Sequence, residues 1–159
     1  MSKRPEHTKL VCQNRKARHD YHIDDRFEAG MVLTGTEVKS LREGRANLKD
    51  SYARVKNGEL WLHQFHISEY PFAYYNNHEP LRIRKLLMHK QEIKRLTGKI
   101  NERGFSLIPL EVYFSRGKAK VTLALARGKK AYDKRQDIKK REGQREMDRI
   151  KKDKGKGDY

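Results

Sequence analysis

Two histidines and two aspartates lie in one short stretch near the start of the chain, and their side chains could exchange protons near neutral pH. His19 and His22 precede the acidic pair Asp24 and Asp25. Imidazole and carboxylate groups often serve as general acid and base, so the cluster raises the hypothesis of an enzyme that cleaves RNA. Residues three apart point to opposite faces of an extended segment, which argues against this site and against a metal site. We therefore expect no enzyme activity, no metal and no cofactor.

The charge balance indicates a different kind of function. Of 159 residues, 38 are Lys or Arg and 21 are Asp or Glu, which gives a net charge of +17. This excess predicts a polyanionic partner, because such charges repel one another within the folded chain. The chain has no run of about 18 apolar residues and no signal peptide, so we expect a cytoplasmic protein without a membrane partner. The single Cys12 fits a reducing compartment. We also expect a monomer.

The central part of the chain has the alternating apolar pattern of β-strands. Every second residue from Phe27 to Leu33 lies on one face of a predicted strand. A short helix is predicted over residues 34–44, because Thr34 and Glu37 have the spacing of a capping box. The outward face of this helix carries Lys39 and Arg42.

Two hairpins and a helix complete the predicted fold. The stretch SYARVKNGELWLHQF predicts a hairpin that turns at Asn57-Gly58, and FSLIPLEVYF with KAKVTLALA predicts a second at Arg116-Gly117. A helix over residues 89–104 separates them. About six short strands are most simply arranged in a closed barrel without free edges. We predict a mainly β fold, an oligonucleotide-binding-type closed antiparallel barrel with flanking helices.

Composition divides the chain into three segments. Residues 1–14 are predicted to be a flexible basic arm, in which TKLVC could pair as an edge strand, and residues 15–127 form the barrel. Residues 128–159 are predicted to be a basic tail that is disordered alone. From residue 127 onward the chain has 14 basic and 7 acidic residues. Its few apolar residues cannot offset the entropy cost of ordering the segment. A charged anionic surface could order this tail as a helix; the alternative is a tail that only aids solubility.

Three stretches of the sequence resemble a known family. They are ARHDYHIDDRFEAGMVLTGTEVKSLREGRANLKDSYA (17–53), RIRKLLM (82–88) and ARGKKAYDKRQDIKKRE (126–142), and together they resemble the signature blocks of SmpB, the SsrA-binding proteins of bacteria. The resemblance implies a non-enzymatic factor of trans-translation. It implies binding to the tRNA-like domain of transfer-messenger RNA and delivery of that RNA, with elongation factor Tu, to stalled ribosomes. It also implies that the tail becomes helical in the empty messenger channel and decoding centre of the small subunit.

The resemblance further implies which residues bind RNA. Those of the barrel are Asn14, Arg15, Lys16, Arg18, Glu28, Lys39, Arg42, Arg84, Lys85 and Leu86. Lys and Arg would contact phosphates, whereas Asn14 would bind a base or ribose. Glu28 would accept hydrogen bonds from bases or 2′-hydroxyls, or order a neighbouring cation. The alternative for Glu28 is a solvated strand residue paired with a Lys.

The tail supplies the residues that the resemblance assigns to the ribosome. They are Gly128, Lys129, Lys130, Tyr132, Asp133, Lys134, Arg135, Lys139, Lys140 and Arg141. Tyr132 stands where many family members carry His; it would stack on a base, but it cannot become cationic.

Two questions stay open at the level of sequence. Composition alone fits a structural ribosomal protein equally well, and only the three blocks favour a trans-translation factor. The loop between the first predicted hairpin and the predicted helix is rich in aromatic residues, which could stack on bases or fold back onto the barrel. They are Tyr70, Phe72, Tyr74 and Tyr75.

Overall fold

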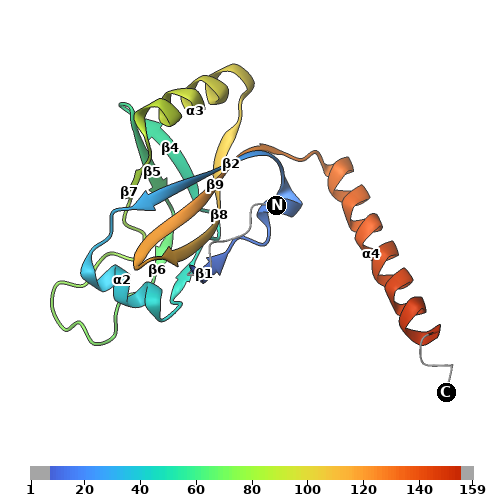
Figure 1. The fold of residues 1–159 in the computed structure, drawn as a ribbon, viewed down its shortest axis with the longest axis horizontal. Coiled ribbons are helices and arrows are strands. Elements are labelled where there is room, and N and C mark those ends of the chain that lie inside the picture. Colours follow the sequence, from blue (N-terminus) through green and yellow to red (C-terminus); the bar gives the residue numbers. More distant parts are fainter. Residues whose placement is uncertain (1–7, 155–159) are drawn as a thin grey trace.

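The fold is a closed antiparallel β-barrel from which one long helix extends (Figure 1). The computed structural model describes residues 8–154. The predictions for residues 1–7 and 155–159 lie outside this range. The strands are β1 (Thr8–Gln13), β2 (Tyr21–Met31), β3 (Ala46–Asn47), β4 (Tyr52–Lys56), β5 (Glu59–His63), β6 (His66–Ile67), β7 (Arg84–Leu87), β8 (Ser106–Ser115) and β9 (Lys118–Gly128). The helices are α1 (Ala17–Asp20), α2 (Gly35–Arg42), α3 (Lys90–Arg103) and α4 (Ala131–Lys154).

Six strands close the barrel in the order β8, β4, β5, β7, β2, β9 and back to β8. Strand β8 is long enough to serve three partners: its start pairs with β4 at Leu107, its end pairs with β1, and its whole length pairs with β9. Strands β3 and β6 form a separate two-stranded sheet. The predicted mainly β, oligonucleotide-binding-type barrel is thereby confirmed.

The turns of the two hairpins follow from their sequences. Asn57 and Gly58 have φ angles of 53° and 72°, the left-handed conformation that a two-residue turn between β4 and β5 requires. The register then pairs Val55 with Leu60 and Ala53 with Leu62, and the side chains of Ala53, Leu60 and Leu62 are buried inside the barrel. Arg116 and Gly117 make the corresponding turn between β8 and β9.

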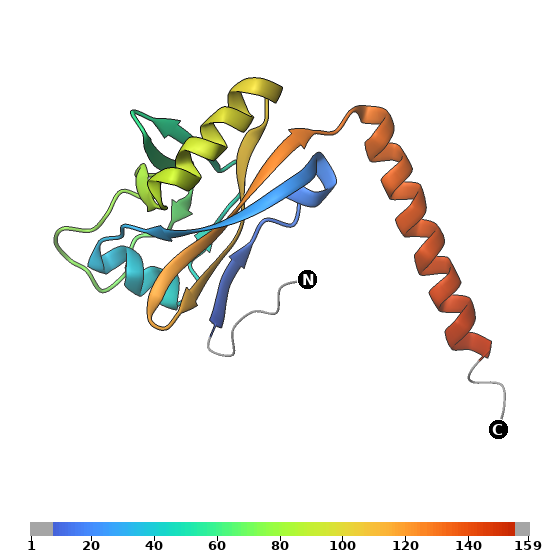
Figure 2. The same ribbon diagram turned by 45° about the horizontal axis from the view of Figure 1, so that its top comes forward.

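The core fills the barrel and continues beneath α3. Its fully buried side chains include Leu60, Leu62, Phe65, Leu107, Val112, Leu123 and Leu125. Helix α3 covers one end of the barrel with Ile93 and Leu96 (Figure 2). The helix ends at Gly104, whose φ of 63° allows its N–H to bond back to the Ile100 carbonyl. A smaller cluster around Ala17, Ile108 and Ala124 packs on the outer side of β8 and β9.

The two ends of the described chain bear on the predicted segments. Residues 8–13 form β1, which pairs with β8 at the edge of the sheet, so the edge strand suggested for TKLVC within the predicted arm is confirmed. Residues 131–154 form α4, and Figures 1 and 2 show it extending away from the barrel. Disorder of this segment in the free protein stays a prediction. None of the helices within residues 8–154 has the length and apolar composition needed to cross a membrane.

Candidate nucleic-acid interface

A groove of about 910 Å³ runs between the α1 turn, strand β4, the end of α3 and the start of β8, and is called the α1 groove here. Its cationic lining residues are Arg15, Lys16, Lys49 and Arg54, and its acidic ones are Asp20 and Asp50. Tyr52 also lines it, with 40% of its surface exposed and its ring stacked on His63 at 5.0 Å and 2° between planes. Cations beside an exposed aromatic face can contact phosphates and bases together.

The structure brings the predicted residues of the NRKAR stretch into this groove. Asn14, Arg15 and Lys16 all line it, and the Asn14 amide donates to the Pro109 carbonyl (3.2 Å). That bond fixes the Asn14 side chain in the wall of the groove through its amide nitrogen, and the amide oxygen can still accept a hydrogen bond. Arg18 is exposed on α1.

Sequence reasoning missed Lys49, Tyr52 and Arg54. The sequence contained a signal for the last two, because the strand YARVK alternates exposed Tyr52 and Arg54 with the inward Ala53 and Val55.

Arg84 does not face solvent, and its predicted contact with RNA is wrong. Its side chain is 0% exposed and its Nε donates to the Glu37 carboxylate, which is also 0% exposed. The guanidinium also donates to the carbonyls of Phe65 (2.5 Å), Arg82 (3.0 Å) and Pro80 (3.2 Å). A buried guanidinium whose three nitrogens all donate hydrogen bonds within the protein ties α2 to β7 and cannot reach a nucleic acid.

Glu37 is the centre of this buried network. Burial alone would raise its pKa, but the Thr34 N–H (3.0 Å) and the two guanidinium groups of Arg82 and Arg84 outweigh burial, so the pKa of Glu37 lies below its ordinary value. The bond to the Thr34 N–H is half of the predicted capping box. Glu37 therefore both caps the first turn of α2 and neutralises the buried Arg84.

The other two predicted residues of β7 differ from each other. Leu86 is only 2% exposed and belongs to the barrel core, so its predicted RNA contact is also wrong. Lys85 alternates with these inward residues and points outward, where its Nζ lies 3.0 Å from Glu59. Of the RKLL block, Lys85 is accessible to RNA.

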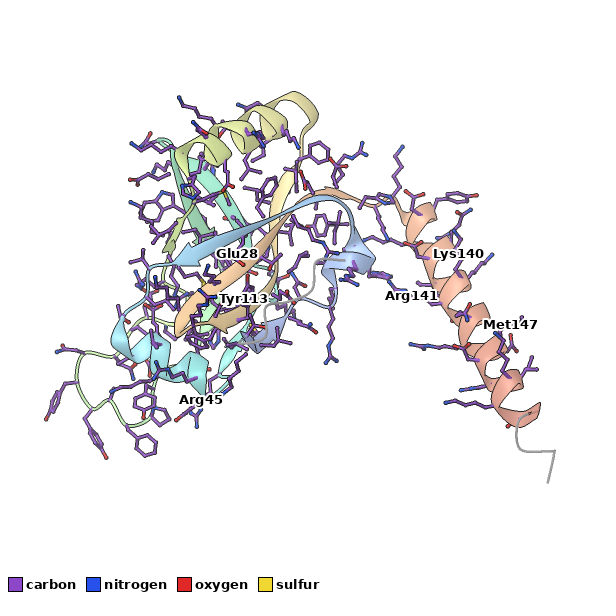
Figure 3. All side chains as sticks on the ribbon, viewed as in Figure 1. Glu28, Arg45, Tyr113, Lys140, Arg141 and Met147 are labelled. Carbon is purple, nitrogen blue, oxygen red and sulfur yellow. The ribbon has the colours of Figure 1, made fainter. Side chains whose placement is uncertain are left out.

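Glu28 is already held by partners within the protein, one of which is Tyr113; Figure 3 labels both residues. It accepts hydrogen bonds from Lys120 (2.7 Å) and from the Tyr113 hydroxyl, and these two bonds hold the pKa of Glu28 below its ordinary value. Burial and the neighbouring carboxylate raise the pKa of Tyr113. The alternative reading of Glu28, a strand residue paired with a Lys, matches this geometry.

Lys39 and Arg42 lie on α2, at a different end of the barrel from α1 (Figures 1 and 2). Both are exposed, and among residues 8–154 neither takes part in a salt bridge. The predicted RNA-binding residues therefore do not form one continuous face: the α1 groove and the surface of α2 are separate.

The base of α4 is attached to α1 and β2 by polar contacts. The Lys129 N–H donates to the Asp20 carbonyl (2.8 Å), and its Nζ donates to the Arg18 carbonyl (3.0 Å) and to Asp137. Lys134 lies 3.5 Å from the Asp20 carboxylate. Hydrogen bonding from His19, together with Lys134, lowers the pKa of Asp20.

One further contact at this base joins His22 Nε2 to the Asp133 carboxylate at 3.4 Å. The predicted tail residues Lys129, Asp133 and Lys134 thus make contacts within the protein. The remaining predicted tail residues, which are Gly128, Lys130, Tyr132, Arg135, Lys139, Lys140 and Arg141, are exposed. Tyr132 is 69% exposed and accepts a hydrogen bond from Gln136 (2.7 Å). Figure 3 shows Lys140, Arg141 and Met147 on the part of α4 that lies away from the barrel.

The residues of the catalytic hypothesis have different partners in the structure: Asp20 for His19, Asp133 for His22 and Lys99 for Asp25. His19 is in α1, bonded to Asp20 (2.8 Å), whereas His22 is in β2 and faces α4, so the argument from an extended segment does not apply to His19. In the described range, no three His, Cys, Asp or Glu residues lie close enough together to hold a metal ion.

Fold and surface together define the class: an oligonucleotide-binding-type barrel with a cationic groove and a basic helical extension. The sequence model of the family described as SmpB protein matches residues 11–153. The chain belongs to the SmpB family.

Similar proteins support this assignment. The SsrA-binding protein of Syntrophobacter fumaroxidans is 68% identical over 92% of this chain and 91% of its own. That of Desulforudis audaxviator is 64% identical, over 94% of this chain and 97% of its own. A solved structure described as "tmRNA-SmpB: a journey to the center of the bacterial ribosome" contains a chain with 53% identity and a TM-score of 0.64, over 76% of this chain and 85% of that one.

Proposed function

We propose that this chain is an RNA-binding protein of trans-translation, which binds the tRNA-like domain of transfer-messenger RNA (SsrA) and delivers that RNA to stalled ribosomes. The observation that carries the proposal is the match to SsrA-binding proteins across both the barrel and most of α4, residues 11–153. The proposal assigns the chain no chemical step, so it acts as a binding factor rather than an enzyme. It works in the cytoplasm, where elongation factor Tu accompanies the delivered RNA.

The barrel is proposed as the module that binds the tRNA-like domain, through the α1 groove. Arg15, Lys49 and Arg54 supply positive charge on its walls, and Tyr52 supplies a flat ring. Phosphate contacts from these cations would set the position of the RNA, while Asn14 and Tyr52 would contact base or ribose. Lys39 and Arg42 would contact a different part of the same RNA.

Helix α4 is proposed as the module that meets the ribosome, in its decoding centre and messenger channel. Its exposed cations from Lys130 to Arg141 suit ribosomal RNA phosphates, and Tyr132 suits stacking on a base. If messenger already filled the channel, the binding free energy of this helix would be lost. The helix would thus contribute only on a ribosome without messenger.

The first test is binding to the tRNA-like domain across a salt series, with alanyl-tRNA as competitor. The proteins compared are the full chain and a truncation after Lys130. Neither core cluster contains a residue after Ala126 and the barrel closes by Gly128, so the truncation keeps the whole core. We expect both to bind tightly despite the competitor, and only the full chain to act on ribosomes stalled without a codon.

Two outcomes would contradict the proposal. Equal, weak binding to every RNA, with the same response to salt, would mean a basic protein without specificity. Retention on ribosomes washed at high salt would instead favour a structural ribosomal protein.

Replacing Lys49 and Arg54 by Ala should flatten the slope of log affinity against log salt by about 0.7–0.9 per lost phosphate contact. An unchanged slope would remove the α1 groove from the interface.

A further inference from the structure

The loop that joins β6 to β7 presents three aromatic side chains to solvent. Phe72 is 68% exposed, and Tyr74 and Tyr75 are each 87% exposed. Large apolar side chains that project this far cost free energy in water unless a partner covers them. These three strongly exposed aromatic residues lie within four consecutive positions of the chain, so they form a cluster rather than scattered exposed side chains.

The base of this loop is fixed, although its tip projects. The Asn77 amide bonds both ways with Tyr70: its Nδ2 donates to the Tyr70 carbonyl (2.9 Å) and its Oδ1 accepts from the Tyr70 N–H (3.2 Å). His78 is buried and bridges Thr36 of α2 (2.9 Å) to the Ile67 carbonyl (2.9 Å). The base of the loop is therefore held beside α2, so a partner would have to order only the tip and not the whole loop.

Helix α2 brings positive charge to the same surface. Lys39 Nζ lies 5.5 Å from the centre of the Tyr70 ring, and the Tyr70 and Phe72 rings meet edge to face at 5.6 Å. Arg42 follows one turn later on the exposed side of α2, and Figure 3 shows Arg45 at the end of this helix. Glu43 offsets Arg45 (3.1 Å), whereas Lys39 and Arg42 have no salt bridge among the described residues.

We propose that Phe72, Tyr74 and Tyr75, together with Lys39 and Arg42 of α2, form a stacking platform for unpaired RNA nucleotides. A partner that presents flat faces and negative charge together matches this surface, because bases stack on the rings and phosphates meet the cations. An apolar protein partner would leave Lys39 and Arg42 without counter-charges. The platform is separate from the α1 groove, so it would bind nucleotides that the groove does not reach.

The test uses the full chain and a twelve-nucleotide oligoadenylate in which one base is 2-aminopurine. Stacking quenches the fluorescence of that base, and each base stacked on a ring accounts for about 5- to 150-fold in affinity. We expect Tyr74→Ala with Tyr75→Ala to lose at least about 5-fold in affinity and to lose the quenching. Tyr74→Phe with Tyr75→Phe should retain both, because it keeps the rings.

Further variants make the result decisive. Tyr74→Leu with Tyr75→Leu keeps apolar surface without flat rings and should behave like the Ala variant. Lys39→Ala should also lower the affinity, and Lys118→Ala, which removes an exposed cation at the β8–β9 turn, is its control for net charge. Equal binding by the Ala, Leu and Phe variants would overturn the proposal, as would concentration-dependent self-association that the Ala variant abolishes. The stacking test does not depend on the identity of the natural RNA. The platform could therefore be supported even if the protein did not bind the tRNA-like domain.

Discussion

Replacing Arg84 by Ala should destabilise the barrel strongly while leaving the RNA-binding surfaces unchanged. The substitution leaves the buried Glu37 carboxylate with Arg82 and with the N–H and hydroxyl of Thr34, and it removes a donor from three carbonyl groups. Removing one partner of a buried ion pair typically costs about 3–5 kcal/mol. Because Arg82 still contacts Glu37, we expect the lower part of that range.

The measurement is urea unfolding followed by Trp61 fluorescence at pH 7. With a denaturant slope near 2 kcal/mol/M, about 3 kcal/mol lowers the midpoint by roughly 1.5 M. The matched control is Lys85→Ala, the outward neighbour on β7, whose exposed pair with Glu59 contributes only about 0–1 kcal/mol. The affinity of the Arg84→Ala variant for the tRNA-like domain, measured without urea, should stay close to that of the unchanged protein.

A double variant shows whether the charge or the packing matters. Replacing both Arg84 and Glu37 by Met removes the two charges together, so it should cost less than Arg84→Ala alone. The low pKa of Glu37 adds a dependence on pH: its contribution to stability is present above its ordinary pKa and is lost as pH falls through the lowered value in the folded protein. An Arg84→Ala protein with normal stability and weakened RNA binding would refute this reasoning.

Other contacts give sharp predictions. Burial raises the pKa of Cys12 to about 11, so at pH 8 its alkylation by iodoacetamide should be on the order of 100-fold slower in the folded protein than in urea; equal rates would contradict the burial. Tyr113→Phe should raise the pKa of Glu28, followed by carboxyl NMR, without restoring its ordinary value because Lys120 remains; no change would mean that the hydroxyl bond is unimportant. Lys134→Ala should raise the pKa of Asp20, and an unaltered titration would show that the base of α4 does not hold Lys134 there.

Local patterns predicted most of the barrel. The two hairpins follow from period-two alternation around Asn57-Gly58 and Arg116-Gly117, and α2 follows from the capping pair Thr34 and Glu37. These signals lie within a few residues of one another, so a single sequence contains them. Helix α1 has four residues and no apolar period, which explains why it was not predicted.

The site was harder to predict than the fold, and Arg84 shows why. An Arg in a strongly basic chain is expected at the surface. The carboxylate of Glu37, which neutralises the buried Arg84, lies 47 positions earlier in the chain. Nothing local to RKLL indicates that pairing. The α1 groove likewise joins β1, β4, α3 and β8, which meet only when the barrel closes. Long-range contacts of this kind depend on topology rather than on any one stretch.

The attachment of α4 at one end makes the helix a lever. The 24 residues from Ala131 to Lys154 span about 36 Å, and within residues 8–154 the polar contacts with the barrel are made by Lys129 and the first turn of the helix. A rotation of about 20° at that base would carry the far end through roughly 12 Å, given this length. Small changes at Asp20 or His22 would thus be magnified at Met147 and beyond. The direction of the helix axis is therefore set by a few polar contacts at the barrel.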